Sequence, residues 1–227
     1  FWAVTLVALA GLVRDITRHP APFISAEVIG NRRFMTPAIA VAFRMFVHDG
    51  IRFLLVLYLV NIFSQTPRTI GFFMLFYGIP LTVGVTYGGF LADRWPGRLV
   101  GGLAMLVLGV GTLWLALVGA DAGTLLLTPG LIVAGLSGGI SLTPFTKTAV
   151  AALGPDRVGL AAGLYNTLRF AGIAVSTPLL GLLLARGFAR YGGLETVAPP
   201  YQTAFLLLTV VAVVGAGIAA LIPHDKE

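Results

Sequence analysis

Residues 89–98 read Gly89-Phe90-Leu91-Ala92-Asp93-Arg94-Trp95-Pro96-Gly97-Arg98. The stretch stands between two long apolar segments and combines one acid, two arginines and a reverse-turn signal. A loop between two membrane helices has to turn at the water boundary and hold its charges there. The stretch therefore predicts a short polar loop that joins two membrane-spanning helices.

The composition of the chain agrees with this interpretation. Hydrophobic residues make up 57% of the sequence and charged residues 11%, with a mean hydropathy of +0.94. A soluble domain of this length carries about twice as much charge. The apolar residues fall in runs of about twenty, the length at which a helix crosses a bilayer while satisfying its own backbone. We predict an all-α polytopic membrane protein embedded in a lipid bilayer.

Several classes of function are disfavoured by the residue counts. The sequence contains no Cys, which excludes disulfides and thiolate metal sites. Lys and Arg (15) outnumber Asp and Glu (9), but these cations lie mainly in short loops between apolar runs. We therefore expect no metal, no cofactor and no nucleic-acid partner.

Six full membrane spans are predicted from the apolar runs. Their approximate ranges are Phe34–Phe63, Ile70–Ala92, Leu99–Val118, Leu125–Ala152, Val158–Leu184 and Tyr201–Ile222. The predicted organisation is the end of a truncated transmembrane helix (1–13), a cytoplasmic connector (14–33), a six-helix bundle (34–222) and a cytoplasmic tail (223–227). Because the chain begins Phe1-Trp2 without an initiator Met or a signal-peptide pattern, we expect it to be a fragment.

The loop cations predict an orientation in the membrane. The side of the connector holds Arg14, Arg18, Arg32, Arg33, Arg94, Arg98, Arg157 and Lys226, and the other side holds Arg68, Arg186 and Arg190. Positive charge gathers on the cytoplasmic side of membrane proteins. We therefore place the connector, the Asp93 loop, the Asp156 loop and the C-terminus in the cytoplasm.

The first full span contains four ionisable residues, Arg44, His48, Asp49 and Arg52. Arg44, His48 and Arg52 share one helix face, and Asp49 can pair with Arg52 three residues on. A charge at the bilayer centre costs roughly 2.5–3.5 kcal/mol. We predict that these residues border a water-filled cavity in which His48 and Asp49 handle protons. The alternative is a structural ion pair with arginines that snorkel to an interface.

Two other cations lie within predicted spans. Arg169 is deep in the fifth span, where it either faces the cavity or holds a helix pair together. Lys147 lies toward the cytoplasmic end of the fourth span, and we expect it to snorkel.

Small residues and prolines recur within the spans. Gly84 and Gly88 are four residues apart, as are Gly159 and Gly163, a spacing that lets helix backbones approach closely. Prolines that can kink a helix stand at Pro80, Pro144 and Pro178. We expect these residues to serve helix packing, with hinges along a pathway as the alternative.

The 89–98 loop resembles the loop signature of the major facilitator superfamily. The matching positions are Gly89, Leu91, Ala92, Asp93, Arg94, Gly97 and Arg98. The sequence departs from the signature by one extra residue at Trp95-Pro96 and by Leu99 in place of the usual second cation.

Two further segments resemble the fourteen-helix drug:proton antiporters of that superfamily. One, His19-Pro20-x-x-Phe23 followed by Asn31-Arg32-Arg33-Phe34, is similar to the connector that precedes the C-terminal half. The other, residues 159–172, is similar to a helix with the pattern G-x-x-x-G-x-x-N-T-x-R-x-x-G, in which Arg169 matches the pattern arginine.

The resemblance implies a C-terminal six-helix bundle built from two inverted three-helix repeats, whose N-terminal half is missing from the chain. It implies a secondary transporter of the bacterial inner membrane that exports drugs by alternating access in exchange for protons. The implied substrate is an apolar or amphipathic small molecule, charged or neutral. In the family the loop latches the two bundles on the cytoplasmic side, and the matching positions are Gly89, Asp93, Arg94, Gly97 and Arg98.

Three alternatives were weighed against this hypothesis. Within the same fold, the Arg44/His48/Arg52 stripe leaves open a proton-coupled or facilitative transporter of a specific anion or metabolite. A membrane-embedded prenyl or acyl transferase needs clustered Asp residues, or a His paired with an acid, at the interface. The sequence contains no such cluster, so we expect no enzyme activity. A membrane scaffold has little reason to bury four ionisable groups.

Overall fold

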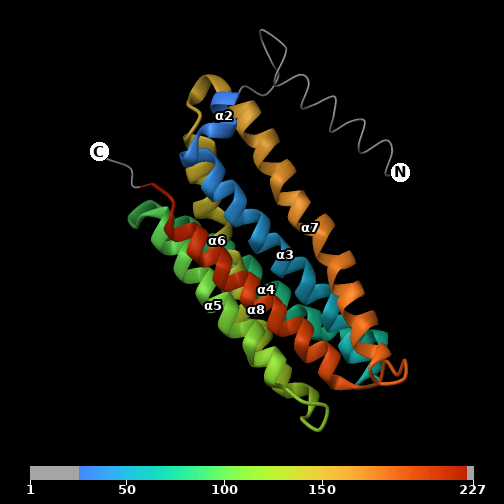
Figure 1. The fold of residues 1–227 in the computed structure, drawn as a ribbon. Helices are drawn as coiled ribbons and strands as arrows, with labels where there is room; N and C mark the ends of the chain where they lie inside the picture. Colours follow the sequence, from blue (N-terminus) through green and yellow to red (C-terminus); the bar gives the residue numbers. More distant parts are fainter. Residues whose placement is uncertain (1–25, 224–227) are drawn as a thin grey trace.

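The apolar runs of the sequence form helices in the computed structural model, which describes residues 26–223 (Figure 1). The helices are α2 (Ala26–Gly30), α3 (Arg32–Asn61), α4 (Pro67–Arg94), α5 (Gly97–Leu117), α6 (Leu127–Ala151), α7 (Val158–Ala189) and α8 (Ala198–Ala220), with 3₁₀ turns η1 (Thr124–Leu126) and η2 (Pro155–Arg157). The predicted helix end at 1–13, most of the connector 14–33 and the tail beyond residue 223 lie outside the described residues.

The predicted all-α fold class is confirmed. Each of the long helices α3 to α8 coincides with one predicted span to within a few residues, except at the end of α7. Helix α7 continues to Ala189 instead of ending at Leu184, because Ala185 and Ala189 favour the helix after the apolar run has ended. The short helix α2, inside the predicted connector, was not anticipated.

Helix α3 differs from the other long helices in its charge. Within the described residues, five helical segments are long and apolar enough to cross a membrane, and α3 is not one of them. Its ionisable residues interrupt the apolar run, yet its 30 residues make a rod about 45 Å long, longer than the hydrocarbon core of about 30 Å. It packs along α6, α7 and α8. We therefore assign α3 as the sixth span, one that its neighbours shield from lipid.

The six long helices form two similar units of three. Helices α4 and α5 both pack on α6, while α7 and α8 both pack on α3, and the remaining extensive contacts are α3 with α6 and α5 with α8. The two units are α3–α5 and α6–α8. If each helix is replaced by its counterpart in the other unit (α3 by α6, α4 by α7, α5 by α8), the same set of packed pairs results. Because successive helices run in opposite directions, α3 and α6 are antiparallel, so the two units are related by inverted topology.

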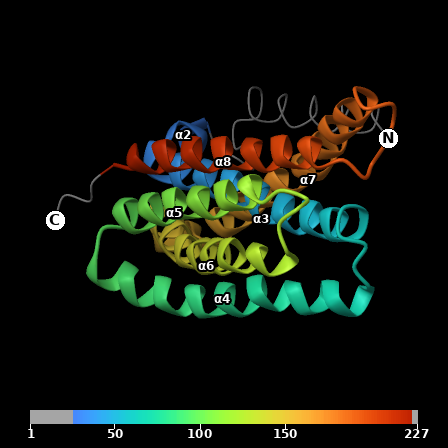
Figure 2. The ribbon, with the colours of Figure 1, turned by 90° about the horizontal axis from the view of Figure 1, so that it is seen from below.

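This arrangement leaves two helices, α4 and α7, largely uncovered. Figure 2 shows α4 along one edge of the bundle and α8 along the opposite edge, with α3, α5 and α6 between them. Helix α7 forms a further edge against α3 (Figure 1). Only 17% of the apolar stretch of α4 and 22% of that of α7 are buried in the bundle, against 56% for α5. Helices α4 and α7 therefore present broad uncovered faces.

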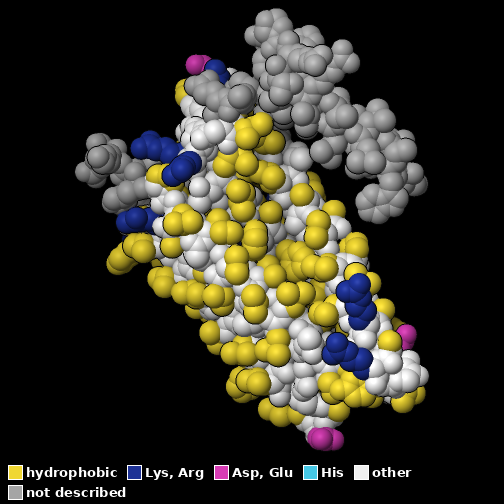
Figure 3. Space-filling model, viewed as in Figure 1, with side chains coloured by type: hydrophobic (Ala, Val, Ile, Leu, Met, Phe, Trp, Pro, Cys, Tyr) yellow, Lys and Arg dark blue, Asp and Glu magenta, His cyan; other side chains and the backbone are white. Residues whose placement is uncertain are grey.

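The surface has the polarity expected of a membrane bundle. Figure 3 shows one face on which hydrophobic side chains cover the middle, while Lys, Arg, Asp and Glu side chains gather toward the two ends. Large apolar residues such as Leu103, Val110 and Val210 are more than half exposed. Solvent exposure on this scale is costly in water but neutral in lipid.

The turn between α4 and α5 follows directly from its sequence. Trp95 takes extended backbone angles (φ −129°, ψ 147°), as expected for a residue that precedes a proline. Pro96 is then the N-cap of α5. The additional residue in the loop thus produces a sharp corner at which α4 ends and α5 begins.

Glycines bring the backbones of α4 and α6 into direct contact. A Cβ atom added at Gly84 or Gly88 would collide with the carbonyl oxygens of Leu136 or Ile140. A Cβ atom at Gly139 would collide in turn with the Leu81 carbonyl oxygen. The glycines of the two helices therefore interlock, and only residues without a side chain fit at this seam.

The three prolines singled out in the sequence all lie inside continuous helices, Pro80 in α4, Pro144 in α6 and Pro178 in α7. Helix α3 contains a further one, Pro37. Each removes one backbone hydrogen bond from its helix, which weakens the helix at that point without ending it.

We expect Gly139→Ala to lower the free energy of unfolding by about 1–3 kcal/mol, the usual cost of overpacking, because backbone atoms cannot move aside as a flexible side chain can. Gly78→Ala is the matched control on α4, since a Cβ there meets nothing within 4 Å. It should be neutral or stabilising, because Ala favours the helix. Thermal unfolding of the full-length protein in detergent measures both. Equal midpoints for the two variants would contradict the glycine seam.

Candidate functional site

Arg44 is buried at the centre of the bundle, with a relative exposure of 2%. Its Nε donates to the carbonyl oxygen of Gly138 on α6 at 2.9 Å, and its Nη1 donates to Met45 Sδ. The Gly138 carbonyl also accepts from Ser141 Oγ at 3.0 Å. The guanidinium is therefore held by a backbone dipole of the neighbouring helix.

His48 lies one turn further along α3 and contacts α4. Its Nδ1 is 2.6 Å from the hydroxyl oxygen of Tyr77, and either group can donate, depending on the tautomer of the imidazole. Tyr77 is 3% exposed. The pair is a hydrogen-bonded link between α3 and α4 in the interior of the bundle.

Asp49 is half-buried and bonds to α7. Its Oδ2 accepts from Thr177 Oγ1 at 2.8 Å. The pairing with Arg52 that the sequence suggested is not formed, and the Arg52 side chain is exposed. The Asp49 carboxylate and the Arg52 guanidinium therefore both lie at an open face of α3.

Arg169 lies on α7 beside the same cluster. Its Nε is buried without a hydrogen-bond partner among the described residues, and its guanidinium carbon is 5.9 Å from the ring centroid of Phe170. One turn earlier, Tyr165 is hydrogen-bonded to Thr146 of α6 at 2.9 Å. Arg44 and His48 both experience the charge of Arg169.

These residues form what we call the polar cluster. Its members are Arg44, His48, Asp49, Arg52, Tyr77, Thr146, Tyr165, Arg169 and Thr177. The cluster joins α3, α4, α6 and α7, and it holds three arginines but one carboxylate. Its surplus positive charge favours a negative group nearby.

The ionisable members of the polar cluster could be identified from the sequence, but their hydrogen-bond partners could not. The sequence did not identify Tyr77, Thr146, Tyr165 or Thr177 as polar partners. Uncharged polar residues are common in membrane helices, so nothing in the sequence marked these as partners of α3. The positions of hydroxyl residues along the chain do not show which residues of two neighbouring helices face each other. That information is needed to pair Tyr77 and Thr177 with α3.

The loop between α4 and α5 is docked against α6. Asp93 accepts from Lys147 Nζ, an ion pair whose side chains are 67% and 50% exposed. A Cβ atom at Gly97 would lie 2.7 Å from Thr148 Oγ1, so the loop also sits close on α6 there. Lys147, expected to snorkel, thus has a definite partner within the bundle.

The other members of the loop signature have separate surroundings. The guanidinium carbon of Arg94 is 4.0 Å from the ring centroid of Phe90. A Cβ atom at Gly89 would make an ordinary contact with Thr143. Arg98 lies instead along α5, in a groove shared with α8.

The second pair of spaced glycines is not packed in the described bundle. A Cβ atom at Gly159 or Gly163 meets nothing within 4 Å. Further along α7, a Cβ atom at Gly172 would collide with the Ala42 carbonyl oxygen of α3. Helix α7 thus uses Gly172 against α3 and leaves Gly159 and Gly163 on its uncovered face.

A helical bundle with inverted three-helix units and a charged central helix defines the class of multi-pass membrane transporters. The comparison with known proteins is specific: residues 3–227 match the Major Facilitator Superfamily. The chain belongs to this family, whose members are transporters and not enzymes.

Named relatives are bacterial proteins. The chain is 22% identical over 92% of its length to the MFS-type transporter YvkA of Bacillus subtilis, covering 44% of that protein. It is 30% identical over 80% of its length to the probable actinorhodin transporter of Streptomyces coelicolor, covering 32% of it. It is 25% identical over 74% of its length to the multidrug resistance protein Stp of Mycobacterium tuberculosis, covering 31% of it. The chain spans less than half the length of these relatives.

The open face of α3 can be tested by thiol labelling, because the chain contains no native Cys. Val56 and Val60 continue the face of Asp49 and Arg52 and are 37% and 43% exposed, whereas Leu55 and Leu59 are fully buried. We expect Val56→Cys and Val60→Cys to react with a membrane-impermeant thiol reagent in intact cells or inverted vesicles. Leu55→Cys and Leu59→Cys, the controls, should not react. Unreactive thiols at positions 56 and 60 would mean that this face meets lipid or protein instead of water.

Proposed function

We propose that the chain is the C-terminal half of a proton-coupled multidrug exporter that works by alternating access. The observation that carries the proposal is the polar cluster on α3, which places His48 and Asp49 in a membrane bundle beside an open face. Two relatives support the choice of export, since one is named a multidrug resistance protein and another an actinorhodin transporter.

The cluster supports proton coupling through Asp49. As a carboxylate, Asp49 accepts the hydroxyl hydrogen of Thr177 and ties α3 to α7. Protonation removes the charge and converts one carboxyl oxygen from an acceptor to a donor. The strength of the α3–α7 link then differs between the two protonation states, which is the requirement for a proton to shift a conformational equilibrium.

The uncovered faces of α4 and α7 support the presence of a second bundle. The apolar side chains Phe72 and Ile79 on α4 and Val175 on α7 are all more than half exposed. The bare glycines Gly159 and Gly163 allow another helix to approach α7 closely. An N-terminal half seated on α4 and α7 would cover these faces and close the space next to Asp49 and Arg52.

The α4–α5 loop is suited to a latch between the two halves. Gly97 and the Asp93–Lys147 pair hold it on α6, and Arg94 remains exposed and available to a partner. Arg98 faces a different groove and is the least suited of the matched residues to this role.

The proposed location is a bacterial cell membrane, with the C-terminus in the cytoplasm. The end of the bundle that holds Arg32, Arg33, Arg94, Arg98 and Arg157 carries more positive charge than the end that holds Arg68, Arg186 and Arg190. By the positive-inside rule, this difference supports a cytoplasmic C-terminus.

We expect Asp49→Asn to reduce pH-gradient-driven transport to background while protein abundance stays at the wild-type level. Asn keeps the shape and can still accept from Thr177, but it cannot exchange a proton. The measurement is substrate efflux in proteoliposomes containing the full-length transporter under an imposed pH gradient. Asp121→Asn, in the exposed loop before η1, is the matched control and should transport normally. Gradient-driven transport at the wild-type rate in Asp49→Asn would remove this residue from the coupling mechanism.

A second candidate function is transport of a specific organic anion, favoured by the surplus of arginines in the polar cluster. In that case, Arg52→Gln should raise KM for an anionic substrate about tenfold, the effect of losing one charge-assisted hydrogen bond. KM for a neutral compound of similar size should stay constant. Arg68→Gln, at the N-terminal end of α4, serves as the control for net charge. Equal changes in KM for the anionic and the neutral compound would reject the anion-specific function.

A further inference from the structure

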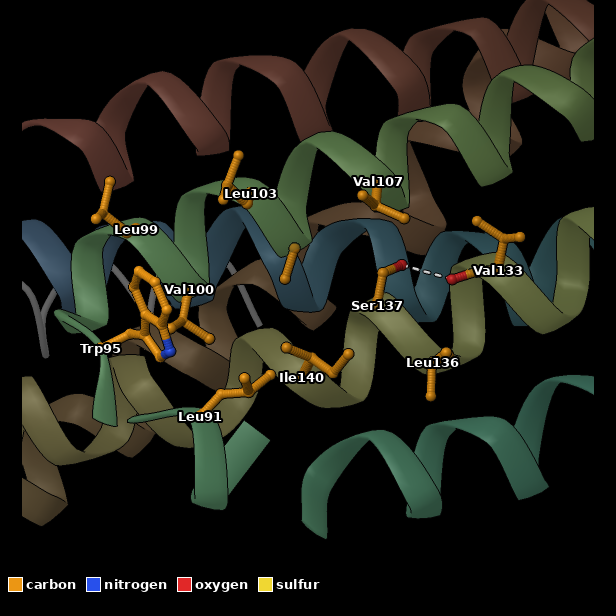
Figure 4. Close-up of a pocket in the computed structure, with 11 residues that line it drawn as sticks. Leu91, Trp95, Leu99, Val100, Leu103, Val107, Val133, Leu136, Ser137 and Ile140 are labelled. Atoms are coloured by element: carbon orange, nitrogen blue, oxygen red, sulfur yellow. Dashed lines mark hydrogen bonds between the residues drawn. The ribbon is translucent and has the colours of Figure 1, made fainter. Parts of the chain in front are cut away.

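A groove of about 480 Å³ runs along the outer side of α5, between this helix and α6 (Figure 4). Figure 4 shows Trp95 at one end and Val107 and Val133 at the other. The lining is apolar apart from Ser137, whose hydroxyl already donates to the Val133 carbonyl oxygen at 2.6 Å. The groove therefore suits hydrocarbon and offers little to a polar ligand.

A second groove, of about 470 Å³, runs along the other side of α5, against α8. Its lining includes small residues, Gly102, Gly217 and Ala220. Leu99 and Leu103 line both grooves, so they form a ridge that separates the two. These leucines are 45% and 61% exposed.

Arg98 stands at the end of the second groove nearest the α4–α5 loop. It is half-buried, its Nε is enclosed without a hydrogen-bond partner, and none of the described residues forms an ion pair with it. Asp93, the nearby carboxylate, is already bound to Lys147. A permanent positive charge thus lies at the polar end of paired apolar grooves, without an anionic partner among residues 26–223.

We propose that an anionic diacyl phospholipid binds here, with one acyl chain in each groove and its phosphate on Arg98. Two chains that diverge from one headgroup need two apolar channels with a common polar end, which the ridge of Leu99 and Leu103 provides. From Arg98 to Val107 α5 rises about 14 Å, close to the thickness of hydrocarbon in one leaflet. A guanidinium matches phosphate geometry with two parallel hydrogen bonds. Trp95, 60% exposed beside it, occupies the headgroup level where Trp is common.

A phospholipid fits this surface better than a second copy of the chain does. A helix laid on the ridge would bury Arg98 without supplying a negative charge unless it also carried a carboxylate there. A phospholipid supplies the hydrocarbon and the anion in one molecule. The site lies apart from the polar cluster, so the proposal does not depend on what is transported.

The test uses full-length protein purified in detergent and native mass spectrometry with added phosphatidylglycerol or phosphatidylcholine that carry identical acyl chains. The wild type should retain phosphatidylglycerol preferentially, and Arg98→Gln should reduce that preference about fivefold, the effect of one interfacial cation. Arg98→Lys should keep most of the preference. Arg186→Gln, an exposed cation at the other end of the bundle, should keep all of it.

A variant in the α5–α8 groove tests the contribution of the acyl chains separately from that of the headgroup. A Cβ atom at Gly217 meets nothing within 4 Å, so Gly217→Leu should fold while filling the α5–α8 groove. We expect it to retain less of both lipids, with unchanged thermal unfolding in lipid-free detergent. Equal retention of the two lipids by the wild type, or an unaltered preference in Arg98→Gln, would overturn the proposal. So would disulfide-linked dimers formed through Leu103→Cys in a membrane, since a second copy would then cover the ridge.

Discussion

The packing of the bundle depends on how the charged helix α3 is buried at its centre. A guanidinium taken out of water has to replace its hydration with other acceptors, and Arg44 uses the carbonyl oxygen of Gly138. On another face of the same helix, Gly135 and Gly139 let the backbone of α4 come into direct contact with α6. Helix α6 therefore supplies a hydrogen-bond acceptor to the charged helix α3 and a glycine surface to α4.

The polar cluster divides into an interior part and an open part. The Arg44–Gly138, His48–Tyr77 and Thr146–Tyr165 contacts are largely enclosed, and each group in them has a partner. Asp49, Thr177 and Arg52 lie where α3 is uncovered. Buried polar contacts are costly to break, whereas half-exposed ones can exchange partners with water or a ligand. The enclosed contacts thus form a rigid framework, whereas Asp49, Thr177 and Arg52 can change their hydrogen-bond partners.

Much of the fold could be predicted from the sequence because lipid permits few backbone structures. Apolar runs of membrane length had to be helices, so the spans from α3 to α8 were located to within a few residues, apart from the end of α7. The charged residues of α3 were also evident, because charge is rare in such segments. Their partners were not evident: Tyr77 and Thr177 are 29 and 128 residues away from His48 and Asp49 along the chain. Pairing at that distance depends on helix register, which composition and spacing do not contain.

The glycines also show that a sequence pattern does not determine which residues pack against each other. The pairs Gly84/Gly88 and Gly159/Gly163 have identical spacing, yet the first is closed against α6 and the second is open. The spacing shows only that a helix can approach, and the topology decides whether a helix is there.

The inverted relation of the two three-helix units explains why the polar cluster and the uncovered faces are connected. Helices α4 and α7 occupy equivalent positions, each packed on the first helix of the other unit. Each also supplies a polar partner to α3, Tyr77 from α4 and Thr177 from α7. In the proposed transporter the second half of the protein rests on these two helices. A shift of that half against α4 reaches His48 through one hydrogen bond, and a shift against α7 reaches Asp49 through another. Coupling between the interface and the titratable groups then needs no long pathway, because the same helices carry both.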